Sequence, residues 1–166
     1  MTVHARQDHT TTDPAERARA LALAILDRAP RSCADLKSRL VAKGVEPEVA
    51  DALVTRYVEV GLLDDTSLAA TIARTRHVER GLAPRAIAQE LRRKGFEEHD
   101  IQAALEPIDS EVQAGTIEQL ARTRWDRLGN LDPEAKARRL AGFLGRKGYP
   151  PGLVFDVVRR LKAVEH

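Results

Sequence analysis

A Lys-Gly dipeptide that recurs in a fixed context constrains the fold of this chain more than any other feature of its sequence. The three copies are 51 and then 53 residues apart, at Lys43-Gly44, Lys94-Gly95 and Lys147-Gly148. Two apolar residues precede each glycine by eight and four positions: Leu36 and Leu40, Ile87 and Leu91, Leu140 and Leu144. Self-similarity at such a period predicts an array built from one structural unit used three times.

The Lys-Gly dipeptides are interpreted as the ends of helices. Glycine adopts the left-handed conformation that closes a helix without the steric cost of a β-carbon. Lysine in the last turn faces the negative end of the helix dipole, and the apolar residue after each glycine can pack back onto that turn. Their recurrence therefore predicts a shared structural role rather than a binding site.

Helical periodicity covers nearly all of the chain. Ala18, Leu21, Ala22, Ile25 and Leu26, for example, stand at positions i, i+3, i+4, i+7 and i+8, which form one face of a helix. Similar patterns follow along the chain, three to each repeat. We therefore predict an all-α protein of three tandem three-helix repeats in an elongated, curved array. The predicted segments are a disordered N-terminal tail over 1–14 and repeats over 15–62, 63–108 and 109–166.

The composition agrees with helix packing. Aromatic residues make up only 4% of the 166 residues, and the apolar residues are mostly Leu, Ala and Val, which favours helix–helix contacts over a β-sandwich. One repeat alone would bury little apolar surface, so the repeats are expected to stack. The first residues lack the pattern of a signal peptide, and no apolar run approaches the roughly 20 residues of a membrane span, so a cytoplasmic protein is expected.

The sequence offers no arrangement of residues typical of catalysis or metal binding. Asp64-Asp65 adjoins the start of a predicted helix, where a carboxylate caps free amides. None of the five histidines lies four residues from another, and Cys33 lies on an apolar helix face, where a buried thiol is expected. No glycine-rich phosphate loop or serine nucleophile motif is present. We therefore expect no enzyme activity, no cofactor and no metal.

Basic residues are distributed unevenly between the repeats. Residues 1–63 carry 9 basic and 9 acidic side chains, whereas residues 109–166 carry 11 and 8. The candidate binding residues lie on the middle helices of the second and third repeats and are Arg85, Arg92, Arg93, Arg138, Arg139 and Arg146. Lys136 lies on the same middle helix as Arg138, Arg139 and Arg146. Together with it, the six arginines predict a basic stripe that meets nucleic-acid phosphates or an acidic partner. Taken singly, each could equally be a solvated surface residue.

The stretch from Leu21 to Ile108 resembles the RecX family, whose members regulate the bacterial recombinase RecA. The residues that carry the resemblance are Arg31-Ser32, Gly61-Leu62-Leu63-Asp64-Asp65 with Leu68-Ala69, and Glu90-Leu91 with Lys94-Gly95-Phe96. The Asp-Asp junction and the Glu-Leu-x-x-Lys-Gly string are fairly specific in combination. Leu68 departs from the family, which usually has Phe there, and the third repeat matches less closely before Leu140.

The resemblance implies tandem three-helix repeats, in agreement with the periodicity. It also implies that the chain binds RecA and its nucleoprotein filament, lodging in the groove of the RecA–DNA filament as an inhibitor. Such binding would modulate ATP hydrolysis, strand exchange and coprotease activity in DNA repair, homologous recombination and the SOS response. The chain is expected to act as a monomer, and direct DNA contact through the basic stripe is left open.

A helix-turn-helix-like DNA-binding regulator is the alternative function, because a three-helix unit can resemble that module. Such a regulator would need one recognition helix rich in base-reading Arg, Asn or Gln. The chain contains a single asparagine, Asn130, and its arginines are spread over several helices. The sequence therefore favours the filament-binding regulator.

Overall fold

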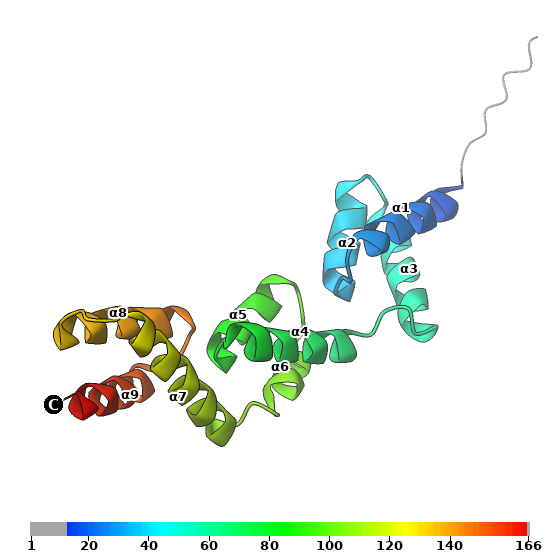
Figure 1. The fold of residues 1–166 in the computed structure, drawn as a ribbon. Coiled ribbons are helices and arrows are strands. Elements are labelled where there is room, and N and C mark those ends of the chain that lie inside the picture. Colours follow the sequence, from blue (N-terminus) through cyan, green and yellow to red (C-terminus); the bar gives the residue numbers. More distant parts are fainter. Residues whose placement is uncertain (1–12, 166) are drawn as a thin grey trace, which may run out of the picture. The chain divides into compact units, whose positions relative to one another are not determined.

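The computed structural model describes residues 13–165, which form α-helices joined by short loops and no strands (Figure 1). The helices are α1 Pro14–Arg28, α2 Cys33–Ala42, α3 Pro47–Glu59, α4 Asp65–Arg80, α5 Pro84–Arg93, α6 Glu98–Leu105, α7 Ser110–Arg127, α8 Pro133–Arg146 and α9 Pro151–Val164. The predicted all-α fold with three three-helix units is confirmed. The elongated, curved form of the array stays a prediction.

The chain divides into two compact units, over residues 1–64 and 65–166. The predicted tail falls outside the described residues except for Asp13 and Pro14. Asp13 is the N-cap of α1, its carboxylate accepting from the amide of Ala15 at 3.2 Å, and Pro14 is the first helical residue. Proline is tolerated there because its missing N–H has no partner within the helix anyway.

All three middle helices end in the same local structure, as the Lys-Gly dipeptides predict. Gly44, Gly95 and Gly148 have φ angles of +92°, +87° and +93°. The amide of the next residue donates to the carbonyl five residues back, from Val45 to Leu40, Phe96 to Leu91 and Tyr149 to Leu144, at 3.0, 3.1 and 3.3 Å. This is the Schellman arrangement, in which two backbone bonds and an apolar contact close the helix.

The first unit packs α1, α2 and α3 around one core. Buried residues come from all three helices, among them Ala22 on α1, Leu36 and Leu40 on α2, and Ala50 on α3. Ser32 caps α2 by accepting from the amide of Asp35 at 3.1 Å, which agrees with the predicted helix start after Arg31-Ser32. Cys33 packs part-buried against this core.

The second unit contains two three-helix cores that share a joint. One core centres on Ile87 and Leu91 of α5, and the other on Leu140 and Leu144 of α8. Ala83, the N-cap of α5, belongs to the second of these cores although it lies in the loop after α4. The second and third repeats are therefore packed against each other through this loop.

Backbone and side-chain hydrogen bonds fix the joint. The amide of Ala83 donates to the carbonyl of Lys147 at 2.8 Å, and Lys147 Nζ donates to the carbonyl of Arg80 at 2.7 Å. The hydroxyl of Tyr149 donates to the carbonyl of Gly81 at 2.8 Å. On the other side of the loop, Nδ1 of the buried His77 donates to the carbonyl of Leu82 at 2.9 Å. The end of α8 and the α4–α5 loop thus satisfy each other's polar groups.

The joint should weaken at alkaline pH. Burial raises the pKa of Tyr149 from its ordinary 10.0 to about 12, because the phenolate loses hydration. The protonated hydroxyl therefore contributes stability that is complete below pH 10 and lost as the pH rises towards 12. We expect Tyr149→Phe to cost about 1 kcal/mol at neutral pH through its hydrogen bond, and to flatten the fall over that alkaline range. Urea unfolding followed by circular dichroism measures both effects, and an equally steep fall in the variant would contradict this assignment.

Candidate functional site

The predicted binding residues lie on the exposed faces of α5 and α8. On α5 the buried side chains are Ile87, Ala88 and Leu91, which leaves Arg85, Arg92 and Arg93 exposed. On α8 the register of Leu140 and Leu144 likewise leaves three arginines exposed, at Arg138, Arg139 and Arg146. The amphipathic spacing of each middle helix therefore places all six guanidinium groups outside the cores.

The joint fixes how the two arginine-bearing helices meet. The N-cap of α5 is bonded to the C-cap of α8 through Ala83 and Lys147. Arg85 and Arg146 lie next to this contact. Arg93 is the last residue of α5, about 12 Å along the helix axis from Arg85, and Arg139 lies in the middle of α8, about 10 Å from Arg146. The arginines are thus distributed along both helices on either side of one packed joint.

Arg92 differs from the other five arginines. Its Nε and a terminal nitrogen bind both oxygens of Glu98, at 3.0 and 2.6 Å. The hydrogen bond from Arg92 lowers the pKa of Glu98 to about 2, so the pair stays ionised at neutral pH. The charge of Arg92 is therefore already compensated by Glu98 before any partner binds. That Arg92 belongs to the predicted basic stripe stays a prediction.

The other candidate arginines are available for a partner. Within residues 13–165, no carboxylate forms an ion pair with Arg85, Arg93, Arg138, Arg139 or Arg146. Exposed guanidinium groups bind carboxylates or phosphates in two-pronged geometry without first breaking an internal bridge. These five residues form the candidate binding surface, which we call the α5–α8 arginine surface.

Lys136 does not belong to this surface, contrary to the sequence-based prediction. It is only 4% exposed; its ammonium contacts Glu165 at 2.5 Å and lies 4.8 Å from the ring centre of Trp125. The same Glu165 oxygen accepts from Trp125 Nε1 at 2.8 Å. The signal was present in the sequence, because Lys136 stands four and eight residues before Leu140 and Leu144 and so on their buried face.

A second group of cations surrounds Phe143 in a groove of about 500 Å³ that α4, α7 and α8 line. The guanidinium of Arg124 lies 4.9 Å from the ring centre and the ammonium of Lys147 lies 5.4 Å from it. Stacking on an aromatic face stabilises such cations. Sequence spacing alone could not pair Arg124 with Phe143, because the ring comes from another helix.

Neither a metal site nor a membrane span is found in the described part of the chain. Residues 13–165 contain no cluster of three His, Cys, Asp or Glu placed to hold a metal ion. In the same range, no helix combines the length and apolarity that crossing a membrane requires.

Comparison with known proteins assigns each three-helix unit. Family models for the first, second and third three-helix domains of RecX match residues 18–56, 64–105 and 111–158. The regulatory proteins RecX of Thermobifida fusca and Streptomyces coelicolor are 40% and 39% identical to this chain. These alignments cover 86% and 89% of this chain and 77% and 79% of the relatives.

Solved structures share the fold. A crystal structure of RecX from Lactobacillus salivarius superposes with a TM-score of 0.78 at 18% identity, covering 91% of this chain and 98% of that one. A crystal structure of a regulatory protein RecX superposes with a TM-score of 0.74 at 26% identity, covering 89% and 72%. With three domain models in their proper order and relatives at 40% identity over most of both chains, this chain belongs to the RecX family.

Proposed function

We propose that this chain inhibits the RecA recombinase by binding the groove of the RecA–DNA filament. Membership of the RecX family supports this function, and the relatives are named regulatory proteins. The observation that carries the proposal is the α5–α8 arginine surface. Its five cations are exposed and unbridged on two helices that a packed joint holds together.

A surface of this kind suits a large, repetitive, negatively charged partner. DNA carries one charge per phosphate, and a protein filament adds carboxylates along its groove, so several guanidinium groups can bind at once. The hydrogen bonds of the joint hold α5 and α8, which carry the arginines, in a fixed relative position. Less conformational entropy is then lost on binding than if the helices moved freely.

In this proposal the chain acts without catalysis of its own, as a cytoplasmic monomer that needs no cofactor. Occupation of the groove would block the protomer movements and DNA exchange on which filament activity depends. ATP hydrolysis, strand exchange and coprotease activity in DNA repair and the SOS response would then fall together.

The test is to add the purified chain to RecA, single-stranded DNA and ATP, and to follow hydrolysis and filament length. We expect both to fall as the chain approaches an equimolar ratio to RecA. No effect at that ratio would refute the proposal. Titration of the DNA without RecA provides the second arm, because a helix-turn-helix-like regulator would bind the bare DNA as tightly as the filament.

A further inference from the structure

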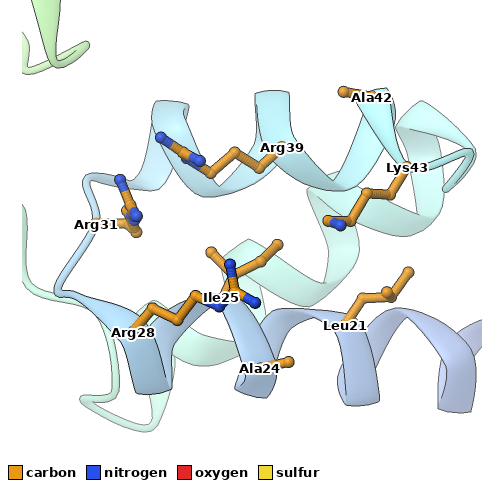
Figure 2. A pocket seen from close by; sticks show the side chains of 8 residues that line it. All are labelled: Leu21, Ala24, Ile25, Arg28, Arg31, Arg39, Ala42 and Lys43. Carbon is orange, nitrogen blue, oxygen red and sulfur yellow. The ribbon is translucent and has the colours of Figure 1, made fainter.

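The first repeat contains a groove that the function proposed above does not use. It lies between α1 and α2, has a volume of about 440 Å³ and is shown in Figure 2. Apolar side chains line part of it, namely Leu21, Ala24, Ile25 and Ala42. The remaining lining residues are all cations, namely Arg28, Arg31, Arg39 and Lys43. We call this feature the α1–α2 groove.

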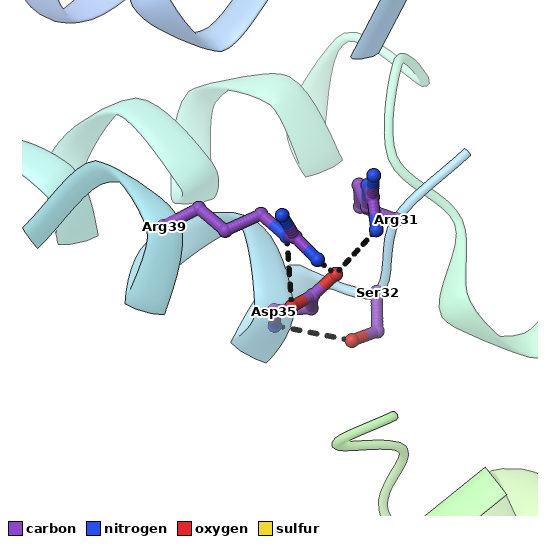
Figure 3. Close-up of polar contacts among 4 residues, drawn as sticks. All are labelled: Arg31, Ser32, Asp35 and Arg39. Atoms are coloured by element: carbon purple, nitrogen blue, oxygen red, sulfur yellow. Dashed lines mark hydrogen bonds and ion pairs between the residues drawn. The ribbon is translucent and has the colours of Figure 1, made fainter. Parts of the chain in front are cut away.

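The cations of the groove outnumber the carboxylates near it. Asp35 binds both Arg31, at 3.4 Å, and Arg39, at 3.1 Å, and so holds these two guanidinium groups in place (Figure 3). Arg28 and Lys43 form no ion pair with any residue in the range 13–165. In addition, the buried Nε of Arg31 has no hydrogen-bond acceptor among the described residues. Four cations thus face one carboxylate, which leaves the groove with a surplus of positive charge.

Corresponding positions in the other two repeats show a cross-helix pair that the first repeat lacks. In the register of the Lys-Gly dipeptides, Arg39 corresponds to Glu90 and Phe143. When the first helices of the repeats are aligned on their buried residues Ala22, Ala73 and Ala121, Ile25 corresponds to Arg76 and Arg124. Arg76 Nε binds Glu90 at 2.9 Å, and Arg124 stacks on Phe143 at 4.9 Å, so each pair bridges its two helices. The first repeat has Ile25 and Arg39 instead, and these two side chains form no such bridge.

The shape and charge of the groove select one class of ligand. Arg31 and Lys43 stand at the two ends of α2, about 15 Å apart along its axis, which is too far for a single phosphate or carboxylate group to reach both. The apolar lining gains nothing from a nucleic-acid backbone, and no aromatic side chain lines the groove for bases to stack on. An amphipathic helix offers both an apolar face and flanking carboxylates over such a length.

We propose that the α1–α2 groove binds an acidic amphipathic helix of a protein partner. Its apolar side chains would pack on Leu21 and Ala24 of α1, beside the edge of the buried Ile25 (Figure 2). Its carboxylates would pair with Arg28 and Lys43, the two exposed cations of the groove that form no ion pair among the described residues. This interaction is independent of the α5–α8 arginine surface, because the two surfaces belong to different repeats.

The test titrates the full chain into a fluorescently labelled synthetic helix that carries leucines on one face and glutamates beside them. We expect saturable binding in fluorescence anisotropy. Two further helices test the chemistry: one replaces the glutamates with lysines and the other replaces the leucines with serines. Both should bind at least about tenfold more weakly, since each removes one of the two complementary features. Equal binding of either control helix, or no binding of the acidic one, would overturn the proposal.

Variants of the chain locate the binding. Arg28→Glu with Lys43→Glu changes two exposed cations and should weaken binding about tenfold or more. Arg19→Glu with Arg74→Glu makes the same charge change on exposed residues outside the groove and should leave binding unaltered. Ile25→Arg with Arg39→Glu copies the bridging pair of the second repeat and should close the groove, with helical circular dichroism retained. Equal weakening by the groove and control variants would show that net charge alone drives the binding, and would overturn the proposal.

Discussion

Reversing the charge of Arg93, Arg138 and Arg139 to glutamate is expected to abolish inhibition of RecA while leaving the fold intact. All three side chains are exposed and form no ion pair within the described residues 13–165, so no ion pair is broken. Each reversal replaces an attraction to the filament with a repulsion. At about 1 kcal/mol for each contact, three reversals raise the concentration needed for half-inhibition roughly a hundredfold.

The control for this variant carries the same change of net charge at other exposed arginines without an ion pair among the described residues, with Arg19, Arg74 and Arg127 changed to glutamate. It should inhibit RecA as the unchanged chain does. Arg92 is left out of the test variant because its reversal would also place a new carboxylate beside Glu98. ATP hydrolysis measures inhibition, and circular dichroism measures helix content. If the test variant with native helix content still inhibited RecA, the interface would lie elsewhere.

Replacing Gly148 with alanine is expected to destabilise the second unit by about 3 kcal/mol, because two costs add there. At a φ of +93°, a β-carbon costs roughly 1–2 kcal/mol in the left-handed region. It would also stand 2.7 Å from the β-carbon of Ala86 and 3.1 Å from its amide nitrogen, and such overpacking costs about 1–3 kcal/mol. Because the contact crosses the joint, the α4–α5 loop and the end of α8 would have to separate.

The fluorescence of Trp125, the single tryptophan, follows this unfolding, because the residue lies in the core of the third repeat. A loss of about 3 kcal/mol in a unit of this size lowers Tm by about 15 °C. Gly129→Ala is the matched control, since Gly129 has a φ of +62° in the same unit and a β-carbon added there would meet nothing within 4 Å. It should lower Tm by about a third as much, because only the backbone cost applies. An equal loss from both substitutions would mean that the joint does not restrict position 148.

The sequence predicted the features of this fold that local interactions decide. Helix periodicity, proline at helix starts and the glycine after each middle helix act within a few residues, so the number of helices per repeat and their ends followed from the pattern. Gly44 and Gly148 show the limit of such reasoning. Both have the same local conformation, but a β-carbon at Gly44 would meet only the guanidinium of Arg17, at 3.8 Å, whereas one at Gly148 would stand 2.7 Å from the β-carbon of Ala86. Tertiary packing decides that difference.

The candidate sites were predictable to a similar extent. Exposure of the arginines on α5 and α8 followed from the apolar register of these helices. The ion pair between Arg92 and Glu98 could not be predicted from that register, because it joins α5 to α6. The α1–α2 groove was missed because the first repeat is electrically neutral in total, whereas the fold gathers four of its cations around one opening.

Co-sedimentation tests the central claim most directly. The chain is mixed with preformed RecA filaments, with the same single-stranded DNA without RecA, and with RecA without DNA. The claim predicts that the chain pellets with filaments near an equimolar ratio. It also predicts that the chain binds RecA alone or DNA alone at least about tenfold more weakly. Salt should weaken all charge-dependent binding. The variant with Arg93, Arg138 and Arg139 changed to glutamate is predicted to stay in the supernatant. Equal binding to bare DNA, or no pelleting with filaments, would contradict the claim.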